Sequence, residues 1–540
     1  MFFIIFFISA ISFSQEFYPL EKLKEGMVGK VKTVLKGSDL KIYPIEIKGI
    51  LRGNTEKDFI ILGKILSPEF EKTGIIAGMS GSPVFIEEKL LGALAYAWDF
   101  SKEPICGITY IKNMMELSEI PVNENMNFLN FQDPILDFDE LFKKLKGKFE
   151  DLLEKNKNLS LQAFPFKKKF SSIMEGGILK VGKNYPLEGG YPIAAMLAWG
   201  DFNLFASGTI TYKDGEKLFA FGHPFLDLGK IEAPLARAYP ETVISSIYSS
   251  IRVSNAGEII GKMETDGKDG IIGKLGKNID GLKIKFNLQD KKKEFFVVKH
   301  PLLSPILTGL GCNLLFYEEK KDAGGGVAFL KLKINEKIKE EIFFENQDIG
   351  DAIFAKIASL LAYLSLNPFK KYSLDLIEID LKFSNKRNLK RIVSAWTNKQ
   401  KIKNNEEVEL NILLKDYDGN EEIIKEKIKL DFQNKIELFV GGIKGLNNLI
   451  KKESSISPQK FEDLLSYLKE KPKEGALNIY IKLPEPSIVK APFTFERANP
   501  IFFYKFPEEQ RKNYGIFKVK EIFSNSPIEG FAKINLEGVK

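Results

Sequence analysis

The chain has 540 residues, of which 44% are hydrophobic and 28% charged, and it carries a net charge of +7. This composition excludes a disordered or fibrous protein, and the length predicts about two to four domains. Lysine and glutamate are interleaved along most of the chain, for example in residues 336–341. The small net charge therefore indicates a solvated surface, and we expect no nucleic-acid partner.

The N-terminus has the pattern of an export signal. Residues 2–13 form an uncharged apolar run of the length of a signal-peptide core, although no Lys or Arg precedes it. Ser12 and Ser14 supply the small residues expected before a cut that leaves Gln15 first. We predict a signal peptide over residues 1–14 and an exported protein, periplasmic or extracellular, without an integral membrane span after cleavage. The alternative is a buried first strand.

The remaining chain is patterned mainly as β structure. Short apolar runs at 27–34, 41–47 and 59–62 predict strands of a sandwich or barrel. Residues 120–137 have the composition of a linker, and 138–156 predict an amphipathic helix. We expect that helix to pack against a neighbouring barrel, with a partner helix as the alternative.

β patterning resumes near residue 178 and continues to about 383. It includes a hairpin over 208–221, because an Asp-Gly turn separates two apolar-rich runs. Residues 353–366 predict a buried helix. Beyond 391, the alternation at 408–414 and the Asp-Gly turn after it predict a small immunoglobulin-like β domain, with a helix at 458–469.

Cysteine and histidine are scarce. Cys106 and Cys312 are the only cysteines, and either a disulfide or two separate buried thiols fits the sequence. No group of Cys and His residues has the spacing of metal ligands. We therefore predict neither a metal nor a cofactor.

A serine loop carries the strongest chemical signal. Residues 78–83 read Gly-Met-Ser-Gly-Ser-Pro, and glycines on both sides of Ser80 permit the tight turn that exposes a hydroxyl nucleophile. The segment resembles the Gly-x-Ser-Gly-x-Pro loop of chymotrypsin-like enzymes, and this resemblance implies that the N–H groups of Gly78 and Ser80 form the oxyanion hole. A strand, a turn and a strand follow over 84–95, as in chymotrypsin-like enzymes. The alternative is a Gly/Ser turn without chemistry.

A serine nucleophile needs a base, and the chain has two histidines. His300 ends a predicted strand, with no glycine or acid nearby. His223 follows the predicted hairpin directly, in Phe-Gly-His-Pro-Phe-Leu-Asp over 221–227. We therefore predict His223 as the general base.

Together these two segments resemble the SpoIVB serine peptidase family. The motif of residues 78–83 is that of the family's nucleophile, and its base lies in a Gly-His element after a hairpin, like Gly222-His223. Residues 244–247, 257–258 and 270–275 resemble the family's stretch after its histidine, so the resemblance covers about 20–115 and 190–285. It implies a chymotrypsin-like double β-barrel and a serine endopeptidase, possibly self-processing, that acts on polypeptides. It leaves the remainder of the chain uncovered.

Three departures from the family stand out. Ser80 precedes His223, whereas the family has the reverse order, so we predict a circularly permuted peptidase domain. The family's Asp before the nucleophile loop is replaced by residue 67 or 68, which are Ser and Pro. Asp227 is our predicted third triad member, with Asp99 and Glu69 as alternatives and a Ser–His dyad as another. No PDZ-like segment is present, whereas SpoIVB carries one.

The predicted fold class is mainly β: a permuted chymotrypsin-like double β-barrel with a helical insertion and a C-terminal immunoglobulin-like domain. The predicted regions are a signal peptide (1–14), the half-domain of the nucleophile loop (15–125), a linker with the amphipathic helix (126–185), the half-domain of the histidine element with supporting β and helical structure (186–385) and the β-rich C-terminal region (386–540). The predicted function is an exported serine endopeptidase. The alternative is a catalytically inactive peptidase-like protein that binds envelope proteins or polysaccharide as a scaffold.

Overall fold

The computed structural model divides the chain into two compact units. Unit 1 comprises Met1–Glu124 and Lys148–Gly281, and unit 2 comprises Asn125–Gly147 and Leu282–Lys540. The structure describes residues 15–539 except 56–57, 118–137, 156–160, 163–183, 277, 321–323, 386–388, 404, 431–435, 443–444, 447–459, 471–474, 484–486, 491–492, 496–510, 513–514 and 525. The predicted signal peptide and the linker at 120–137 lie outside the described residues.

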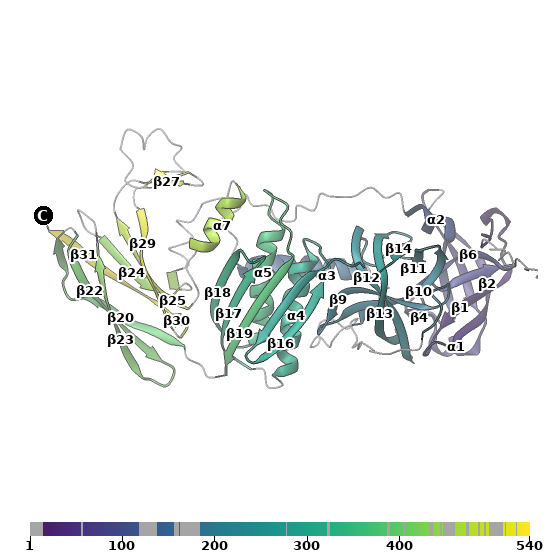
Figure 1. The fold of residues 1–540 in the computed structure, drawn as a ribbon, viewed down its shortest axis with the longest axis horizontal. Coiled ribbons are helices and arrows are strands. Elements are labelled where there is room, and N and C mark those ends of the chain that lie inside the picture. Colours follow the sequence, from purple (N-terminus) through teal and green to yellow (C-terminus); the bar gives the residue numbers. More distant parts are fainter. Residues whose placement is uncertain are drawn as a thin grey trace, which may run out of the picture. The chain divides into compact units, whose positions relative to one another are not determined.

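The first half of unit 1 is a closed barrel of six strands in the order β1-β2-β3-β7-β6-β5 (Figure 1). Along β1 and β3 every second residue is buried in the barrel core, whereas β5, β6 and β7 are buried along most of their length. Its elements are η1 (Leu20–Lys22), β1 (Val28–Val34), β2 (Leu40–Arg52), β3 (Phe59–Ile65), α1 (Pro68–Thr73), β4 (Ile76–Ala77), β5 (Pro83–Ile86), β6 (Lys89–Ala97), β7 (Ile105–Tyr110) and α2 (Ile111–Glu116).

The second half of unit 1 is also a closed circuit of six strands. Antiparallel pairs run β9-β12-β13-β14-β11-β10, and β10 returns to β9. Its elements are β8 (Leu161–Gln162), β9 (Pro192–Gly200), β10 (Leu204–Asp214), β11 (Lys217–Ala220), β12 (Gly229–Ile244), β13 (Ser250–Gly267) and β14 (Gly270–Leu275). Strand β4 of the first half pairs in parallel with β13, so the chain leading to the serine loop is bonded to the second barrel.

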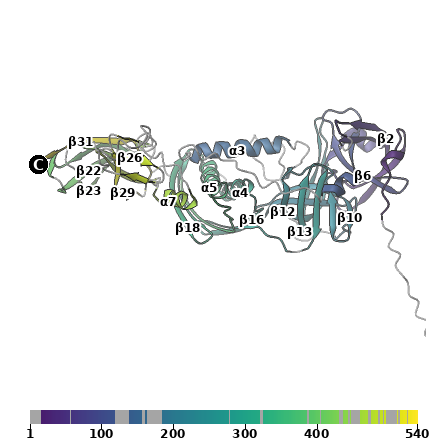
Figure 2. The same ribbon diagram turned by 90° about the horizontal axis from the view of Figure 1, so that it is seen from above.

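Unit 2 contains a five-stranded stretch of sheet in the order β18-β17-β19-β15-β16, in which β15 and β19 run parallel. Two buried helices that pack on each other cover one face of it (Figure 2). The elements are β15 (Leu282–Leu288), β16 (Lys291–Val297), α4 (Leu303–Glu319), β17 (Gly326–Ile334), β18 (Ile338–Asn346), α5 (Ile349–Ser365) and β19 (Leu376–Ser384). The helix α3 (Phe138–Lys155) brings Phe142 against Phe354 of α5, with ring centroids 4.8 Å apart.

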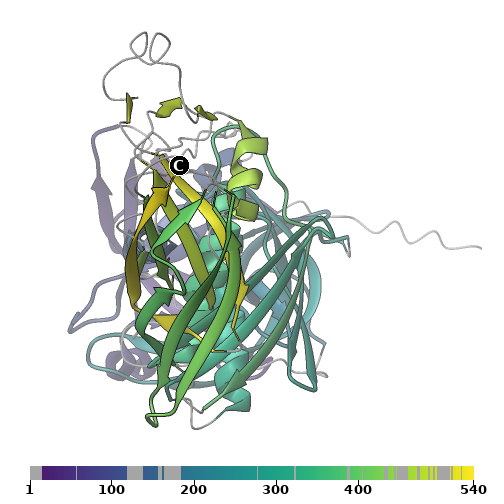
Figure 3. The same cartoon turned by 90° about the vertical axis from the view of Figure 1, so that its left-hand side faces the viewer.

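The C-terminal part of unit 2 has a four-stranded sheet, β23-β22-β20-β30, and a five-stranded sheet, β21-β31-β24-β25-β29 (Figure 3). Side chains of both sheets form one hydrophobic core. The elements are β20 (Lys390–Thr397), β21 (Lys401–Lys403), β22 (Glu407–Asp416), β23 (Glu421–Lys429), β24 (Ile436–Gly441), α7 (Phe461–Glu470), β25 (Ala476–Leu483), β26 (Ser487–Lys490), β27 (Phe493–Phe495), β28 (Arg511–Lys512), β29 (Gly515–Phe523), β30 (Ile528–Glu529) and β31 (Phe531–Val539). Its assignment as immunoglobulin-like stays a prediction.

The mainly β fold with its double barrel confirms the predicted fold class. The predicted hairpin over 208–221 and the predicted helices at 138–156 and 353–366 are also present, as β10–β11, α3 and α5. Helix α4 was not predicted, since we expected continuous β structure through that stretch. The boundary between the units near residue 281 falls inside the predicted 186–385 region, and the predicted domain limits stay predictions.

Candidate active site

The serine loop connects β4 to β5 at the junction of the two barrels. Gly78 and Gly81 have φ angles of +99° and +96°, which only glycine adopts without strain, and Ser80 between them is half-buried. A Cβ added to Gly81 would overlap the carbonyl oxygen of Thr209 and lie 2.6 Å from the N atom of Phe221. The loop therefore lies directly against the second barrel, at the segment that leads to His223.

The two serines of the loop have different surroundings. Ser82 is fully buried, and its hydroxyl donates to the carbonyl of Met79 at 2.6 Å and lies 3.0 Å from Thr33 Oγ1. In the described part of the chain, neither the hydroxyl nor the N–H of Ser80 makes a hydrogen bond, whereas the N–H groups on either side are used. Ser82 therefore holds the loop in shape, and Ser80 keeps a free hydroxyl and a free backbone donor.

The histidine loop lies between β11 and β12 and rests on the first barrel. A Cβ on Gly222 would lie 2.8 Å from Ala93 Cβ and 3.2 Å from Ala95 Cβ, both on β6. The carbonyl of Gly222 accepts a hydrogen bond from Thr109 Oγ1 at 2.6 Å. The serine loop contacts the same part of β6, because the N–H of Gly81 donates to the carbonyl of Leu94 at 2.7 Å. The structure thus brings the Ser80 and His223 loops together on one strand.

The imidazole of His223 is only 3% exposed. Its Nδ1 lies 2.7 Å from the carbonyl oxygen of Pro224, and a carbonyl can only accept, so Nδ1 carries the proton. Nε2 is then unprotonated, and it is buried without a hydrogen-bond partner among the described residues. Burial lowers the pKa of the imidazole, and the bond to the carbonyl opposes this only partly. The ring is therefore neutral at pH 7 and has the tautomer that a base acting through Nε2 requires.

The predicted acids do not hydrogen-bond to His223. Asp227 is exposed, in a left-handed turn with φ of +58°. Glu69 instead accepts a hydrogen bond from the Tyr43 hydroxyl at 2.7 Å, and Asp99 is exposed in the connection after β6. Ser67 and Pro68, one of which falls where the family's Asp is expected, are the residue before α1 and the first residue of α1. The carbonyl of Pro224 occupies the Nδ1 side of the ring instead of a carboxylate.

Asp266, a buried carboxylate on β13, supports the histidine loop, and sequence reasoning missed it. Its Oδ1 accepts from the N–H of Phe225 at 2.7 Å, and its Oδ2 accepts from those of Leu226 and Leu228 at 2.7 and 3.1 Å. Burial raises the pKa of Asp266 to about 6, although the three N–H groups act in the opposite direction. In sequence, Asp266 precedes a glycine and gives only a turn signal.

Arg252 is fully buried between the barrels and was also missed. Its Nη1 donates to the carbonyl of Val34 in the first barrel at 2.7 Å, and its Nη2 donates to that of Gly208 in the second at 2.8 Å. A Cβ on Gly78 would lie 3.2 Å from Arg252 Nε, so the guanidinium packs on the serine loop. Burial lowers the pKa of Arg252 to about 9, which leaves it charged at neutral pH.

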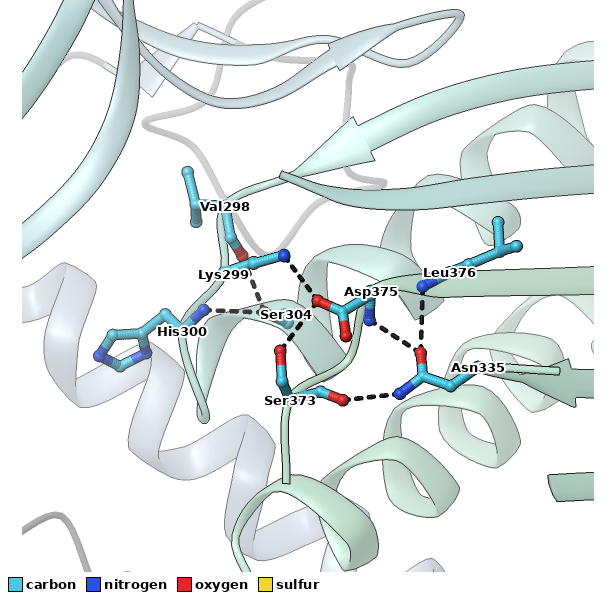
Figure 4. Close-up of polar contacts among 8 residues, drawn as sticks. All are labelled: Val298, Lys299, His300, Ser304, Asn335, Ser373, Asp375 and Leu376. Atoms are coloured by element: carbon cyan, nitrogen blue, oxygen red, sulfur yellow. Dashed lines mark hydrogen bonds and ion pairs between the residues drawn. The ribbon is translucent and has the colours of Figure 1, made fainter. Parts of the chain in front are cut away.

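The second histidine, His300, has a structural role at the start of α4 (Figure 4). Its Nδ1 accepts from the N–H groups of Leu302 and Leu303, both at 3.3 Å, and its own N–H donates to Ser304 Oγ at 2.9 Å. Burial lowers the pKa of His300 to about 4, so the ring stays neutral and keeps this acceptor.

A polar cluster beside His300 is drawn in the same view (Figure 4). Lys299 forms an ion pair with Asp375 at 2.6 Å, and Asn335 accepts from the N–H groups of Asp375 and Leu376. Ser373 Oγ donates to Asp375 at 2.9 Å. These bonds join the ends of β16, β17 and β19, so they account for the cluster as structural.

Both cysteines are buried free thiols. Burial raises the pKa of Cys106 to about 12 and that of Cys312 well above its ordinary value, so neither forms the thiolate that a nucleophile requires. Of the two outcomes that the sequence left open, the structure has the unpaired thiols.

Two closed six-stranded barrels, with a serine loop and a histidine loop in contact at their junction, define the chymotrypsin-like class of fold. A comparison with known protein families matches part of this fold: residues 14–115, about a fifth of the chain, match the family model of SpoIVB peptidase S55. The match contains the Ser80 loop and ends before His223. Searches of the curated proteins and of the solved structures found no match. Among the described helices, none is long and apolar enough to cross a membrane.

Proposed function

We propose that this protein is an exported serine endopeptidase of the SpoIVB type, with Ser80 as nucleophile and His223 as general base. The observation that carries the proposal is the contact of the two loops, with Gly81 against Phe221 and both loops on residues 93–95 of β6. Two loops from different barrels that meet in this way are what a Ser–His pair requires. The family match over 14–115 supports a serine peptidase in general.

The proposed chemistry is acyl transfer. Ser80 Oγ attacks the carbonyl carbon of a peptide bond while Nε2 of His223 takes the hydroxyl proton. The N–H groups of Gly78 and Ser80 donate hydrogen bonds that stabilise the negative charge developing on the carbonyl oxygen. The C–N bond then breaks, the amine leaves with the proton from His223, and water hydrolyses the acyl-enzyme by the same steps. The half-buried Ser80 leaves the nucleophile accessible to a polypeptide.

The surroundings of Nδ1 bear on the third member of the proposed triad. Asp227 was the expected acid, but Nδ1 lies 2.7 Å from the carbonyl of Pro224. We infer that this carbonyl performs the orienting half of the acid's role, because it fixes the tautomer. It does not supply a negative charge to stabilise the imidazolium, so we expect slow chemistry and a substrate held close, as in self-processing.

The test is covalent labelling with a fluorophosphonate probe, followed by mass spectrometry of the modified peptide. We expect labelling of wild type at Ser80, none in S80A and a strong decrease in H223Q. S82A is the matched control, because it removes the other hydroxyl of the same loop, and we expect it to be labelled. Equal labelling of wild type and S80A would disprove Ser80 as the nucleophile.

The same proteins test export and self-processing. When the full chain is expressed with its N-terminus intact, the exported form should begin at Gln15. Cleavage elsewhere should occur in wild type and not in S80A if the enzyme processes itself. Among the residues that the structure describes, no carboxylate hydrogen-bonds to His223, and this favours the second candidate, an inactive binding or scaffold protein of the envelope. An unlabelled but folded wild type, with peptide binding retained, would support that candidate.

A further inference from the structure

The peptide group between Pro224 and Phe225 is hydrogen-bonded at both of its edges. Its carbonyl oxygen lies 2.7 Å from Nδ1 of His223, and its N–H donates to Oδ1 of Asp266 at 2.7 Å. A trans peptide group is planar, and its C=O and N–H point in opposite directions. The imidazole and the carboxylate therefore lie on opposite edges of one rigid group, although His223 and Asp266 are far apart in the sequence.

The direction of this carbonyl depends on few degrees of freedom. Two backbone rotations turn the peptide group, ψ of Pro224 and φ of Phe225, and the proline ring fixes only φ of its own residue. The side chains of Phe225 and Leu226 are fully buried, which anchors the chain after the group. The hydrogen bond at the N–H edge therefore selects whether the carbonyl faces the ring of His223 or turns away from it.

The Asp266 carboxylate is itself held in a fixed orientation. It is fully buried, and its Oδ2 accepts from the N–H groups of Leu226 and Leu228 at 2.7 and 3.1 Å, which leaves Oδ1 for Phe225. A charged acceptor binds an N–H more strongly than a neutral one, and hydrogen bonds in series polarise one another in a low-dielectric interior. The carboxylate thus fixes the peptide group and also strengthens its carbonyl as the acceptor for the Nδ1 proton.

We propose that Asp266 is the positioning residue of His223, and that it acts through the peptide group of Pro224 and Phe225 to keep the proton on Nδ1 and leave Nε2 free for the Ser80 proton. This inference rests on the proposed function, in which His223 is the general base. In the serine-protease template, a carboxylate orients the imidazole by direct contact. Here a carboxylate orients it through one intervening peptide group.

The tautomer of His223 can be measured directly. In protein labelled with nitrogen-15 at histidine, protonated and unprotonated ring nitrogens have different chemical shifts. The chain has two histidines, so the spectrum of H300Q assigns the signals. The measurement is made at pH 8, where Asp266, with its pKa of about 6, is ionised. We expect His223 of the wild type to carry its proton on Nδ1.

D266N tests the role of the carboxylate, because Asn has one acceptor oxygen and one NH2 group. When the oxygen serves the N–H groups of Leu226 and Leu228, the NH2 group faces the N–H of Phe225, so the peptide group turns. We expect the tautomer protonated at Nε2 to appear. The rate constant for fluorophosphonate labelling of Ser80 should decrease by about tenfold or more at unchanged probe affinity, within the loss of about four orders of magnitude that the wrong tautomer causes in the template.

The matched control is T109V, which loosens the same loop elsewhere. It removes the hydrogen bond from Thr109 to the carbonyl of Gly222 and leaves the Asp266 side of the loop intact. We expect T109V to have a lower melting temperature and to keep the proton of His223 on Nδ1. A tautomer change in T109V as large as that in D266N would overturn the proposal, because any loosening of the loop would then be sufficient.

The other outcomes separate the positioning role from the peptidase. A folded D266N with the wild-type tautomer and labelling rate would overturn the positioning role and retain the peptidase. D266S, which removes both carboxylate oxygens, is the second variant and should show the same tautomer change. Failure of both variants to fold would also overturn the proposal, because Asp266 would then hold the fold and not the ring. An Asp266-dependent tautomer in a protein that is not labelled at Ser80 would retain the positioning role and reject the peptidase.

Discussion

Replacing Asp266 by Asn tests how the histidine loop is held, because it removes a buried ionisable group and keeps its shape. Burial raises the pKa of this carboxyl from 3.8 to about 6. Between these two values the folded state holds a proton that the unfolded chain releases, so the contribution of Asp266 to stability is complete below pH 4 and is lost as pH rises through 6. Asn does not titrate, so D266N lacks this pH dependence.

The size of the effect follows from the shift of the pKa. A shift of about two units corresponds to about 3 kcal/mol, of which between about 2 and 3 kcal/mol develops between pH 4 and pH 7. We therefore expect the free energy of unfolding of D266N, relative to wild type, to increase by that amount over this range. Asn keeps a single acceptor oxygen for the three N–H groups of the loop, which adds an offset that does not depend on pH.

The assay is urea unfolding of unit 1 at a series of pH values. The chain has three tryptophans, and Trp396 is the one in unit 2, so a W396F background leaves Trp98 and Trp199 to report on unit 1. A difference between D266N and wild type that stays constant from pH 4 to pH 7, or that decreases, would refute the reasoning. It would mean that the three hydrogen bonds outweigh the cost of burying the carboxylate.

Three further substitutions test the packing around the site. G81A should lose fluorophosphonate labelling and several kcal/mol of stability, because its Cβ would overlap the second barrel. The control G215A is also at positive φ but in open space, so it should cost only about 1 kcal/mol and keep labelling. Similar effects of the two substitutions would contradict the packing of Gly81 on the second barrel. R252M should lower the free energy of unfolding in urea by about 3 kcal/mol, because it leaves one buried carbonyl in each barrel without its donor. An unchanged free energy of unfolding would show that the stability of the two barrels does not depend on Arg252. H300A should cost about 1 kcal/mol through the lost cap of α4 and leave labelling unchanged; a labelling loss would reassign the base.

An element could be predicted from the sequence where the residues that determine it lie close together in the chain. The hairpin around Asp214 and Gly215 was predictable because its turn and both strands lie within a few residues of each other. Helix α4 was not, because residues 303–316 are buried on every side, so the run lacks the 3.6-residue period of an amphipathic helix. A continuous apolar stretch of this kind is compatible with either a buried strand or a buried helix.

The residues of the candidate site also differ in how far they could be predicted from the sequence. Ser80 and His223 were identifiable from short motifs, but the residues that hold their loops make long-range contacts. Arg252 bonds across 218 positions, and Asp266 across about 40. In sequence, an Arg on a strand resembles a surface residue and an Asp before a glycine resembles a turn. The acid was sought near His223 and before Ser80, whereas Nδ1 meets a main-chain carbonyl, a group that no side-chain motif records.

That carbonyl leads to a prediction about the pH dependence of the proposed chemistry. In the serine-protease template, the Asp orients the imidazole and stabilises its charged form, and the loss of both roles costs about four orders of magnitude in rate. Here the carbonyl of Pro224 fixes the tautomer, but burial without a carboxylate lowers the pKa of His223 below 6.5. The neutral base is then the predominant form at pH 7, and lowering the pH reduces it as the pH falls through that depressed pKa. We therefore expect the labelling rate of Ser80 to be slow, constant from pH 7 to pH 9, and halved at a pH below 6.5. A midpoint above 6.5 would mean that a carboxylate stabilises the imidazolium, and would return Asp227 or another acid to the triad.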